Sequence, residues 1–292
     1  MTTQFTLNTL VAGSHYAIVA TGFALAYRSM RIFDFGYAAV YAVAPYSALL
    51  VYRVRGVPLP VAFGVGVAAA SVFAAGLEFC DYRPLRHRGA SSLVLMMASF
   101  GVLIVAQNVI SMAFGNEANT LRTWEAREGY EISGAYITGV QVLTVFCAAG
   151  LLLATYGLLR LTRIGKRLRA VTSNVDLAYS IGFDVDSVVV KGYMIAAALG
   201  AVAAILVGLD TDLTPGMGLP ALLPAVVVCI IGGVDSLPGV IAGAFLLAGV
   251  QQLAIWGLGS QWQDTIAFVV LLLFLVARPR GFWGRRAKKA TV

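Results

Sequence analysis

The sequence predicts an all-α fold, a polytopic transmembrane bundle of about eight or nine helical spans. Hydrophobic residues make up 59% of the 292 residues and charged residues only 12%, whereas soluble domains have about 25% charged residues. The apolar residues gather in runs of about 20, the length with which a helix crosses the hydrocarbon core of a bilayer. A membrane β-barrel would show alternating segments of about ten residues, and the sequence has no such pattern. We therefore expect residues 1–292 to form a single transmembrane domain.

Nine apolar segments follow one another along the chain. We expect them at 7–27, 33–52, 59–79, 93–114, 136–159, 188–209, 221–231, 240–258 and 266–277. Pro45 lies in the middle of the second segment and is expected to kink it, because proline removes a backbone hydrogen bond. The segment 221–231 is too short to span alone, so 221–258 forms either two spans or one broken unit.

The lysine and arginine residues are distributed unevenly over the intervals between the spans. If the C-terminus is cytoplasmic, most of these 21 residues fall on the cytoplasmic side, as the positive-inside rule requires. This orientation places a basic loop at 160–187 and a basic tail at 278–292 in the cytoplasm, with the N-terminus outside. The loops explain the net charge of +7, so no nucleic-acid partner is expected.

The loop at 160–187 has two different halves. Five basic residues occupy ten positions between Arg160 and Arg169. The part after Val171 has apolar residues close to helical spacing, which predicts a short surface helix just outside the membrane, ended by Gly182. A second interpretation of the basic half is that it only anchors phospholipid headgroups.

The segment GGVDSLPG interrupts the last third of the chain. Five of its residues are turn-prone or helix-breaking: Gly232, Gly233, Asp235, Pro238 and Gly239. At membrane depth such a break would be a hinge or would line a solute pathway. At the cytoplasmic surface it would be an ordinary turn between two helices. Composition alone does not separate these interpretations.

Motifs of catalysis and metal binding are absent from the sequence. The chain has no GxxxxGK[ST] loop, GxSxG elbow or HExxH pair. Its histidines are His15 and His87, and its cysteines, Cys80, Cys147 and Cys229, are far apart. We expect no catalytic residue, no metal and no cofactor. The remaining classes are a passive channel, an ion-coupled secondary carrier, and a subunit of a larger transport machine.

Four segments, in the same order, resemble the H-type permeases of branched-chain amino-acid ABC importers. They are FGVLIVAQNVISMAFG at 100–115, RAVTSNVDLAYSIGFDVDSVV at 169–189, GGVDSLPGVIAGA at 232–244 and RPRGFWGRR at 278–286. The likeness extends over nearly the whole chain. It implies a permease subunit of the bacterial inner membrane that gives a small amino acid alternating access to the two sides.

The resemblance also implies partners. Two cytoplasmic ATP-binding subunits would hydrolyse ATP, a paralogous permease or a second copy would complete the path, and an extracytoplasmic binding protein would deliver the solute. The short cytoplasmic helix, about 174–183, would dock on an ATP-binding subunit. The residues expected at this contact are Lys166, Arg167, Arg169, Asn174, Asp176 and Gly182.

Five polar residues in or beside the spans are candidates for the solute path: Asp34, Tyr37, Tyr41, Gln107 and Asn108. Asp34 could meet the ammonium group of an amino acid or pair with Arg28 or Arg31, because an intramembrane acid needs a partner. The two amides could instead form hydrogen bonds between helices, and the tyrosines could form an interfacial belt.

The second span departs from the pattern of the family, which has NFAHG before it. This chain has an acid, Asp34, at the position of the asparagine, and Tyr37 at the position of the histidine. Asp235 likewise replaces a common glycine of the later motif. The solute is therefore open between branched-chain amino acids and urea, short amides or other small polar solutes.

Overall fold

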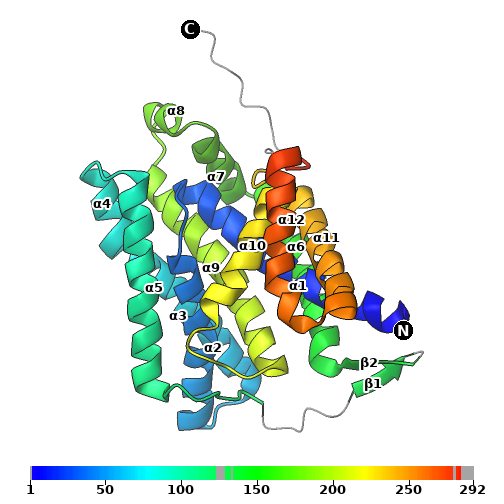
Figure 1. Ribbon diagram of the computed structural model, residues 1–292. Helices are drawn as coiled ribbons and strands as arrows, with labels where there is room; N and C mark the ends of the chain where they lie inside the picture. Colours follow the sequence, from blue (N-terminus) through cyan, green and yellow to red (C-terminus); the bar gives the residue numbers. More distant parts are fainter. Residues whose placement is uncertain (1, 123–128, 133, 279–280, 284–292) are drawn as a thin grey trace.

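The computed structural model describes residues 2–122, 129–132, 134–278 and 281–283. Helices pack side by side in a bundle, and a small β-hairpin lies at one end (Figure 1). The helices are α1 (Thr2–Met30), α2 (Gly36–Arg55), α3 (Leu59–Leu77), the π-helical turn η1 (Glu78–Tyr82), α4 (Arg83–His87), α5 (Ser92–Phe114), α6 (Gly139–Leu161), α7 (Arg163–Ser173), α8 (Val175–Ser180), α9 (Val185–Asp210), α10 (Gly218–Gly232), α11 (Leu237–Leu258), the 3-10 turn η2 (Ser260–Trp262) and α12 (Gln263–Ala277). The strands are β1 (Gly129–Ile132) and β2 (Ala135–Thr138), which pair antiparallel.

Each of the nine predicted apolar segments forms a helix over most of its length, although 136–138 belong to β2 and 33–35 precede α2. Seven helices in the described ranges are long and apolar enough to cross a membrane. The other two segments are α2, which is less hydrophobic because it carries several tyrosines, and α10, which has only 15 residues. The predicted all-α transmembrane bundle is thus confirmed. Residues 221–258 form two helices rather than one broken unit, and α2 continues through Pro45.

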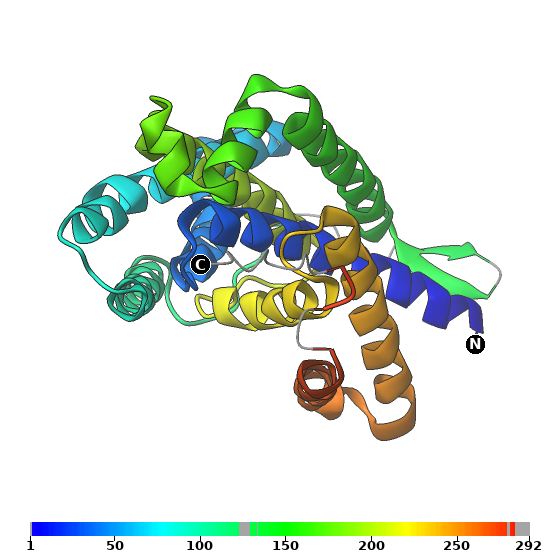
Figure 2. The same ribbon diagram turned by 90° about the horizontal axis from the view of Figure 1, so that it is seen from above.

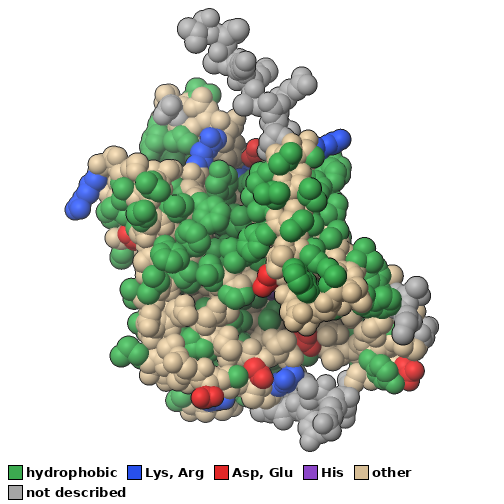
Figure 3. All heavy atoms as spheres, in the orientation of Figure 1, with side chains coloured by type: hydrophobic (Ala, Val, Ile, Leu, Met, Phe, Trp, Pro, Cys, Tyr) green, Lys and Arg blue, Asp and Glu red, His purple; other side chains and the backbone are tan. Residues whose placement is uncertain are grey.

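The helices differ greatly in how much protein surrounds them. In α1 and α9, 72% of the residues of the hydrophobic stretch are buried inside the protein, whereas in the last span, Ser260–Ala277, the share is 6%. Seen from above, α1 and α10 lie near the middle of the bundle and α5 and α12 at its edges (Figure 2). Hydrophobic side chains cover much of the face shown in Figure 3, and basic side chains lie toward its two ends. The outer helices therefore offer apolar surface to lipid.

Two helices begin inside the bundle. The linker between α1 and α2 is non-helical and descends into the bundle from the end of α1 (Figure 1). Tyr37, the second residue of α2, packs on Gly200 near the middle of α9. Gly218, the first residue of α10, lies so close to the Ala38 carbonyl oxygen that a side chain there would overlap with it. Non-helical backbone at membrane depth is tolerated here because protein surrounds it.

The GGVDSLPG segment is a four-residue turn between α10 and α11. Gly233 has φ +88°, a left-handed conformation that favours glycine. Asp235 lies 3.9 Å from Arg28 at the end of α1, and Trp283 N–H donates to the Gly232 carbonyl oxygen. The break thus sits at the end of the bundle where α1 and α12 finish, which agrees with the second interpretation, a turn. A hinge role for it stays a prediction.

Gly232 offers a test of this turn. A Cβ on Gly232 would overlap with the backbone carbonyl of Gly239, which cannot move aside as a side chain can. We expect Gly232→Ala to lower the free energy of unfolding by about 1–3 kcal/mol through overpacking. The control is Gly76→Ala in α3, where a Cβ meets nothing within 4 Å. Thermal unfolding in detergent should separate the variants, and equal melting temperatures would contradict the close approach.

Candidate functional site

Two short helices, α7 and α8, project from one end of the bundle (Figure 1). Each begins at a side-chain cap: Thr162 Oγ1 accepts from Gly165 N–H at 3.1 Å, and Asn174 Oδ1 accepts from Leu177 N–H at 3.0 Å. Gly182, with φ +80°, follows the end of α8. The surface helix predicted within 174–183 is therefore present, and Asn174 and Gly182 bound it.

The basic helix α7 is amphipathic. Gly165, Leu168 and Val171 are buried, while the predicted contact residues Lys166, Arg167 and Arg169 are exposed. A side chain at Gly165 would overlap with the backbone of Leu158 and Leu159, so only glycine permits the tight passage from α6 to α7. The apolar side of α7 rests on the bundle and its charged side faces outward.

Helix α8 and Ile181, the residue after it, present apolar side chains to the outside. The exposed fractions are 57% for Leu177, 53% for Tyr179 and 60% for Ile181, while Ala178 points inward. Asp176 belongs to this helix, but its side chain lies outside the described residues. Apolar side chains grouped on a projecting, hydrophilic segment are typical of a protein-binding surface.

The base of this segment is held to the bundle by polar contacts. Asp186, near the start of α9, lies 3.0 Å from Arg83 and 3.3 Å from His87. The Arg31 guanidinium donates to the Thr172 carbonyl oxygen at the end of α7. A pocket of about 230 Å³ lies among these groups and is also lined by Tyr179 of α8. A displacement of α8 would therefore be transmitted through these contacts to α4, to α9 and to the residue that follows α1.

Asp34 is fully buried in the linker between α1 and α2. Its Oδ1 accepts from the Tyr82 hydroxyl at 2.6 Å and from Gly36 N–H at 2.7 Å. Its Oδ2 accepts from the Tyr193 hydroxyl at 2.6 Å. The carboxylate also lies at the N-terminus of α2, where a negative charge is favourable. Four elements, the linker, α2, η1 and α9, are thus joined through one acid.

The two arginines considered as partners of Asp34 lie elsewhere. Arg28 is beside Asp235, and Arg31 contacts Thr172. The acid instead uses Tyr82 and Tyr193, which we did not predict as site residues. Tyr82 ends a π-helical turn, a feature that recurs at functional sites. The sequence indicated a buried polar site only through Asp34, an acid between two apolar spans. It gave no indication that Tyr82 and Tyr193 are the partners of this acid.

A second buried acid lies in the same turn. Glu78 is completely buried and forms a two-point ion pair with Arg86 of α4. We did not predict this pair. It fixes α4 against the π-helical turn and so supports the position of Tyr82.

Tyr37 and Tyr41 are core residues rather than members of an interfacial belt. The Tyr37 hydroxyl donates to the Val19 carbonyl oxygen at 3.2 Å, and the Tyr41 hydroxyl lies 3.0 Å from His15 Nε2. Both side chains are nearly inaccessible to solvent. Both belong to the first turns of α2, which follows Asp34 in the chain, and both bond to α1.

Gln107 and Asn108 lie apart from that cluster. Both are on the exposed face of α5, whose buried face carries Leu95, Ser99, Leu103, Ala106 and Ile110. Asn108 Nδ2 donates to the Ile104 carbonyl oxygen of its own helix at 2.8 Å, and its side chain forms no hydrogen bond with another helix among the described residues. Gln107 lies beside Gly216, in the loop that leads into α10. No three metal-ligating side chains gather within the described part of the chain.

The family model described as branched-chain amino acid transport system / permease component matches residues 5–275. The high-affinity branched-chain amino acid transport system permease protein BraD of Pseudomonas aeruginosa is 28% identical, over 97% of this chain and 95% of its own length. The corresponding LivH protein of Escherichia coli (strain K12) is 27% identical over the same shares.

A solved structure shares the fold. PsaBC from Streptococcus pneumoniae, in complex with Fab, aligns with a TM-score of 0.54 at 15% sequence identity. The alignment covers 94% of this chain and 92% of that chain. At this identity the likeness concerns the arrangement of helices only.

Proposed function

The chain belongs to the family of branched-chain amino acid transport permease components, and from this we propose the solute, partners and orientation of its transport. The match over residues 5–275 supports the proposal most strongly. The chain is a multi-pass membrane permease, without ATP hydrolysis of its own, of an ATP-driven importer. Its proposed solute is a branched-chain or related small amino acid, as the names of its relatives suggest.

The proposed orientation puts α7, α8 and the end of α12 in the cytoplasm, and the tail 278–292, most of which lies outside the described residues, follows there. The positive-inside distribution supports this sidedness. At the opposite end the Gln4 amide exchanges two hydrogen bonds with the backbone of Tyr136, so the start of α1 is tied to the hairpin. This end is proposed to receive an extracytoplasmic binding protein.

Two ATP-binding subunits and a second permease are proposed to complete the complex. The exposed apolar residues of α8 support one ATP-binding subunit per permease, docked on α8. Gln107 and Asn108 support a second permease near α5, because polar amides facing lipid are unfavourable at membrane depth. The solute path is proposed to pass along this face, beside the buried start of α10.

Reconstitution tests the proposal directly. Proteoliposomes containing the chain, a second permease and ATP-binding subunits should take up labelled leucine only with ATP and the binding protein present. ATP-dependent uptake of urea or acetamide in place of leucine would change the assigned solute but leave the ATP-driven mechanism in place. Uptake that follows an ion gradient without ATP would overturn the ATP-driven assignment.

Gln107 provides a sharper test of the path. No other described residue forms a hydrogen bond with its amide. If this amide binds a charged group of the solute, Gln107→Leu should raise the KM of uptake about 10-fold or more, since such a hydrogen bond contributes about 1.5–3 kcal/mol. The control is Val109→Leu, which is also exposed but lies on the opposite side of α5 from Gln107. An unchanged KM would remove Gln107 from the path.

A further inference from the structure

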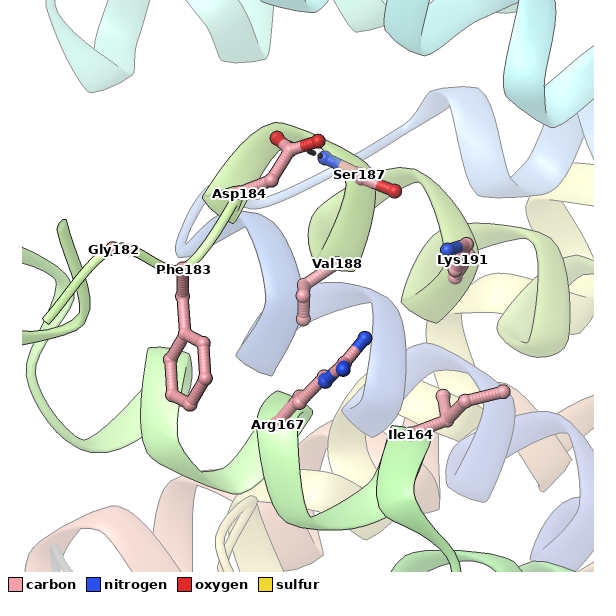
Figure 4. A pocket seen from close by; sticks show the side chains of 8 residues that line it. All are labelled: Ile164, Arg167, Gly182, Phe183, Asp184, Ser187, Val188 and Lys191. Carbon is pink, nitrogen blue, oxygen red and sulfur yellow. Dashed lines mark hydrogen bonds between the residues drawn. The ribbon is translucent and has the colours of Figure 1, made fainter.

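A pocket of about 310 Å³ lies between α7 and the first turns of α9, beside the surface of α8 proposed for the ATP-binding subunit (Figure 4). Its lining includes two of the residues expected from the sequence at the contact with that subunit, Arg167 and Gly182. Its lining has a charged part and an apolar part. Arg167 extends from α7 toward the turn of α9 that carries Val188 and Lys191. Ile164 and Phe183 form apolar walls.

The lining of this pocket carries a net positive charge. Within the part of the chain that the structure describes, neither Arg167 nor Lys191 forms an ion pair or a side-chain hydrogen bond. The one acid of the lining, Asp184, accepts from Ser187 N–H at 3.1 Å and so caps α9. Figure 4 shows its carboxylate turned to this amide, at the opposite side of the pocket from the Arg167 guanidinium. The lining thus carries two cations and one carboxylate, and the carboxylate is already engaged by the backbone amide of Ser187.

The depth of Lys191 indicates where an anion would come from. Lys191 is six residues into α9, about 9 Å from the start of this membrane-spanning helix at 1.5 Å per residue. It is exposed rather than buried in the bundle. A lysine at this position keeps its ammonium group charged by extending toward the headgroup layer.

The surroundings of the pocket are those of a membrane interface. Leu161 and Ile164, at the junction of α6 and α7, are 80% and 42% exposed. Basic residues flank them at Arg160 and Arg163. A helix with exposed apolar residues beside cations lies at the headgroup boundary of a bilayer. Acyl chains can therefore cover Ile164 while a headgroup enters the pocket.

We propose that this pocket binds the phosphodiester of an anionic phospholipid from the adjacent leaflet, between Arg167 and Lys191. Arg167 would form two parallel hydrogen bonds to phosphate oxygens, and the Lys191 ammonium group would add a positive charge from the α9 side of the pocket. The bound lipid joins α7 to α9 and so fixes the base of α8. In this proposal Arg167 of α7 binds the lipid, whereas α8 binds the ATP-binding subunit.

Native mass spectrometry of the full chain, released from nanodiscs, tests the site. Discs of phosphatidylglycerol mixed with phosphatidylcholine should yield the wild type with phosphatidylglycerol retained. Each cation near a membrane surface contributes about 1 kcal/mol to the binding of anionic lipid. Arg167→Gln with Lys191→Gln should therefore weaken retention roughly 30-fold.

The control variant is Arg163→Gln with Lys166→Gln, which removes the same charge from α7 outside the pocket. It should retain the lipid. Equal losses in both variants would overturn the site in favour of unspecific surface charge. Displacement of the lipid by millimolar inorganic phosphate, without preference for the lipid, would identify a free-anion site instead. Full lipid retention in the pocket variant with loss of the ATP-binding subunit would assign the two cations to that protein. All variants alter exposed residues, and circular dichroism checks that they fold.

Discussion

Replacing Leu177 and Ile181 with glutamate is expected to lower ATP-dependent uptake at least about 100-fold while leaving the chain folded. Both side chains are more than half exposed, Leu177 on α8 and Ile181 directly after it, so their replacement removes no core packing. Central apolar residues of a protein interface often contribute 2 kcal/mol or more each, and burying a new charge adds to the loss. The measurement is uptake by proteoliposomes, together with capture of ATP-binding subunits by the purified chain.

The matched control is Ser173→Glu, an exposed position at the end of α7 that adds a negative charge next to α8. It should keep most of the uptake and the capture. If the double variant still captures ATP-binding subunits and transports normally, α8 is not the coupling element. If capture is normal and only uptake fails, α8 acts after docking, and the interface lies elsewhere on this end of the bundle.

Removing the Asp34 carboxylate is expected to be the most destabilising single substitution at the buried network. Asp34→Leu leaves the Tyr82 and Tyr193 hydroxyls and Gly36 N–H without their acceptor. Each buried donor left unpaired costs about 1–3 kcal/mol, so the total is several kcal/mol. Asp34→Asn keeps one acceptor oxygen and should lose less. Thermal unfolding and limited proteolysis in detergent measure these differences.

The tyrosine variants separate a structural role from a solute-binding role for Asp34. Tyr82→Phe and Tyr193→Phe should each lower the unfolding free energy by about 1.5–3 kcal/mol, since each hydroxyl donates to a charged group. Tyr136→Phe, on the exposed side of the hairpin, is the control and should have no effect. If Asp34→Asn retains full stability but abolishes uptake, the acid contacts the solute during transport, as one of the sequence-based interpretations has it.

The spans and the cytoplasmic segment were predictable because their signals are local. A run of apolar residues identifies a helix in lipid whatever its neighbours are. The helix α8 could be placed because Asn174 and Gly182 are its own start and stop signals. The same local reasoning could not tell whether GGVDSLPG lies in the membrane or at its surface, since the residues at both places are alike.

The arrangement around Asp34 required the tertiary structure. Its tyrosine partners are 48 and 159 residues away in sequence. Tyr193 lies in an apolar stretch that could face lipid or protein equally well, and Tyr82 lies in a polar segment after the third predicted span. The positions at which α2 and α10 begin inside the bundle likewise depend on the helices that surround them. The assignment of Arg167 and Lys191 to one pocket joins two helices whose order in the sequence says nothing about their distance.

By itself the sequence determined that this protein crosses a membrane many times, which segments do so, and that a capped basic segment leaves the bundle between two of them. These properties follow from the cost of burying charge and backbone in hydrocarbon, which acts on each segment alone. Only the tertiary structure decided which polar side chains are enclosed and which stay exposed. Helices that are apolar on every side carry no periodic signal of their inner face, so packing between distant segments makes that choice.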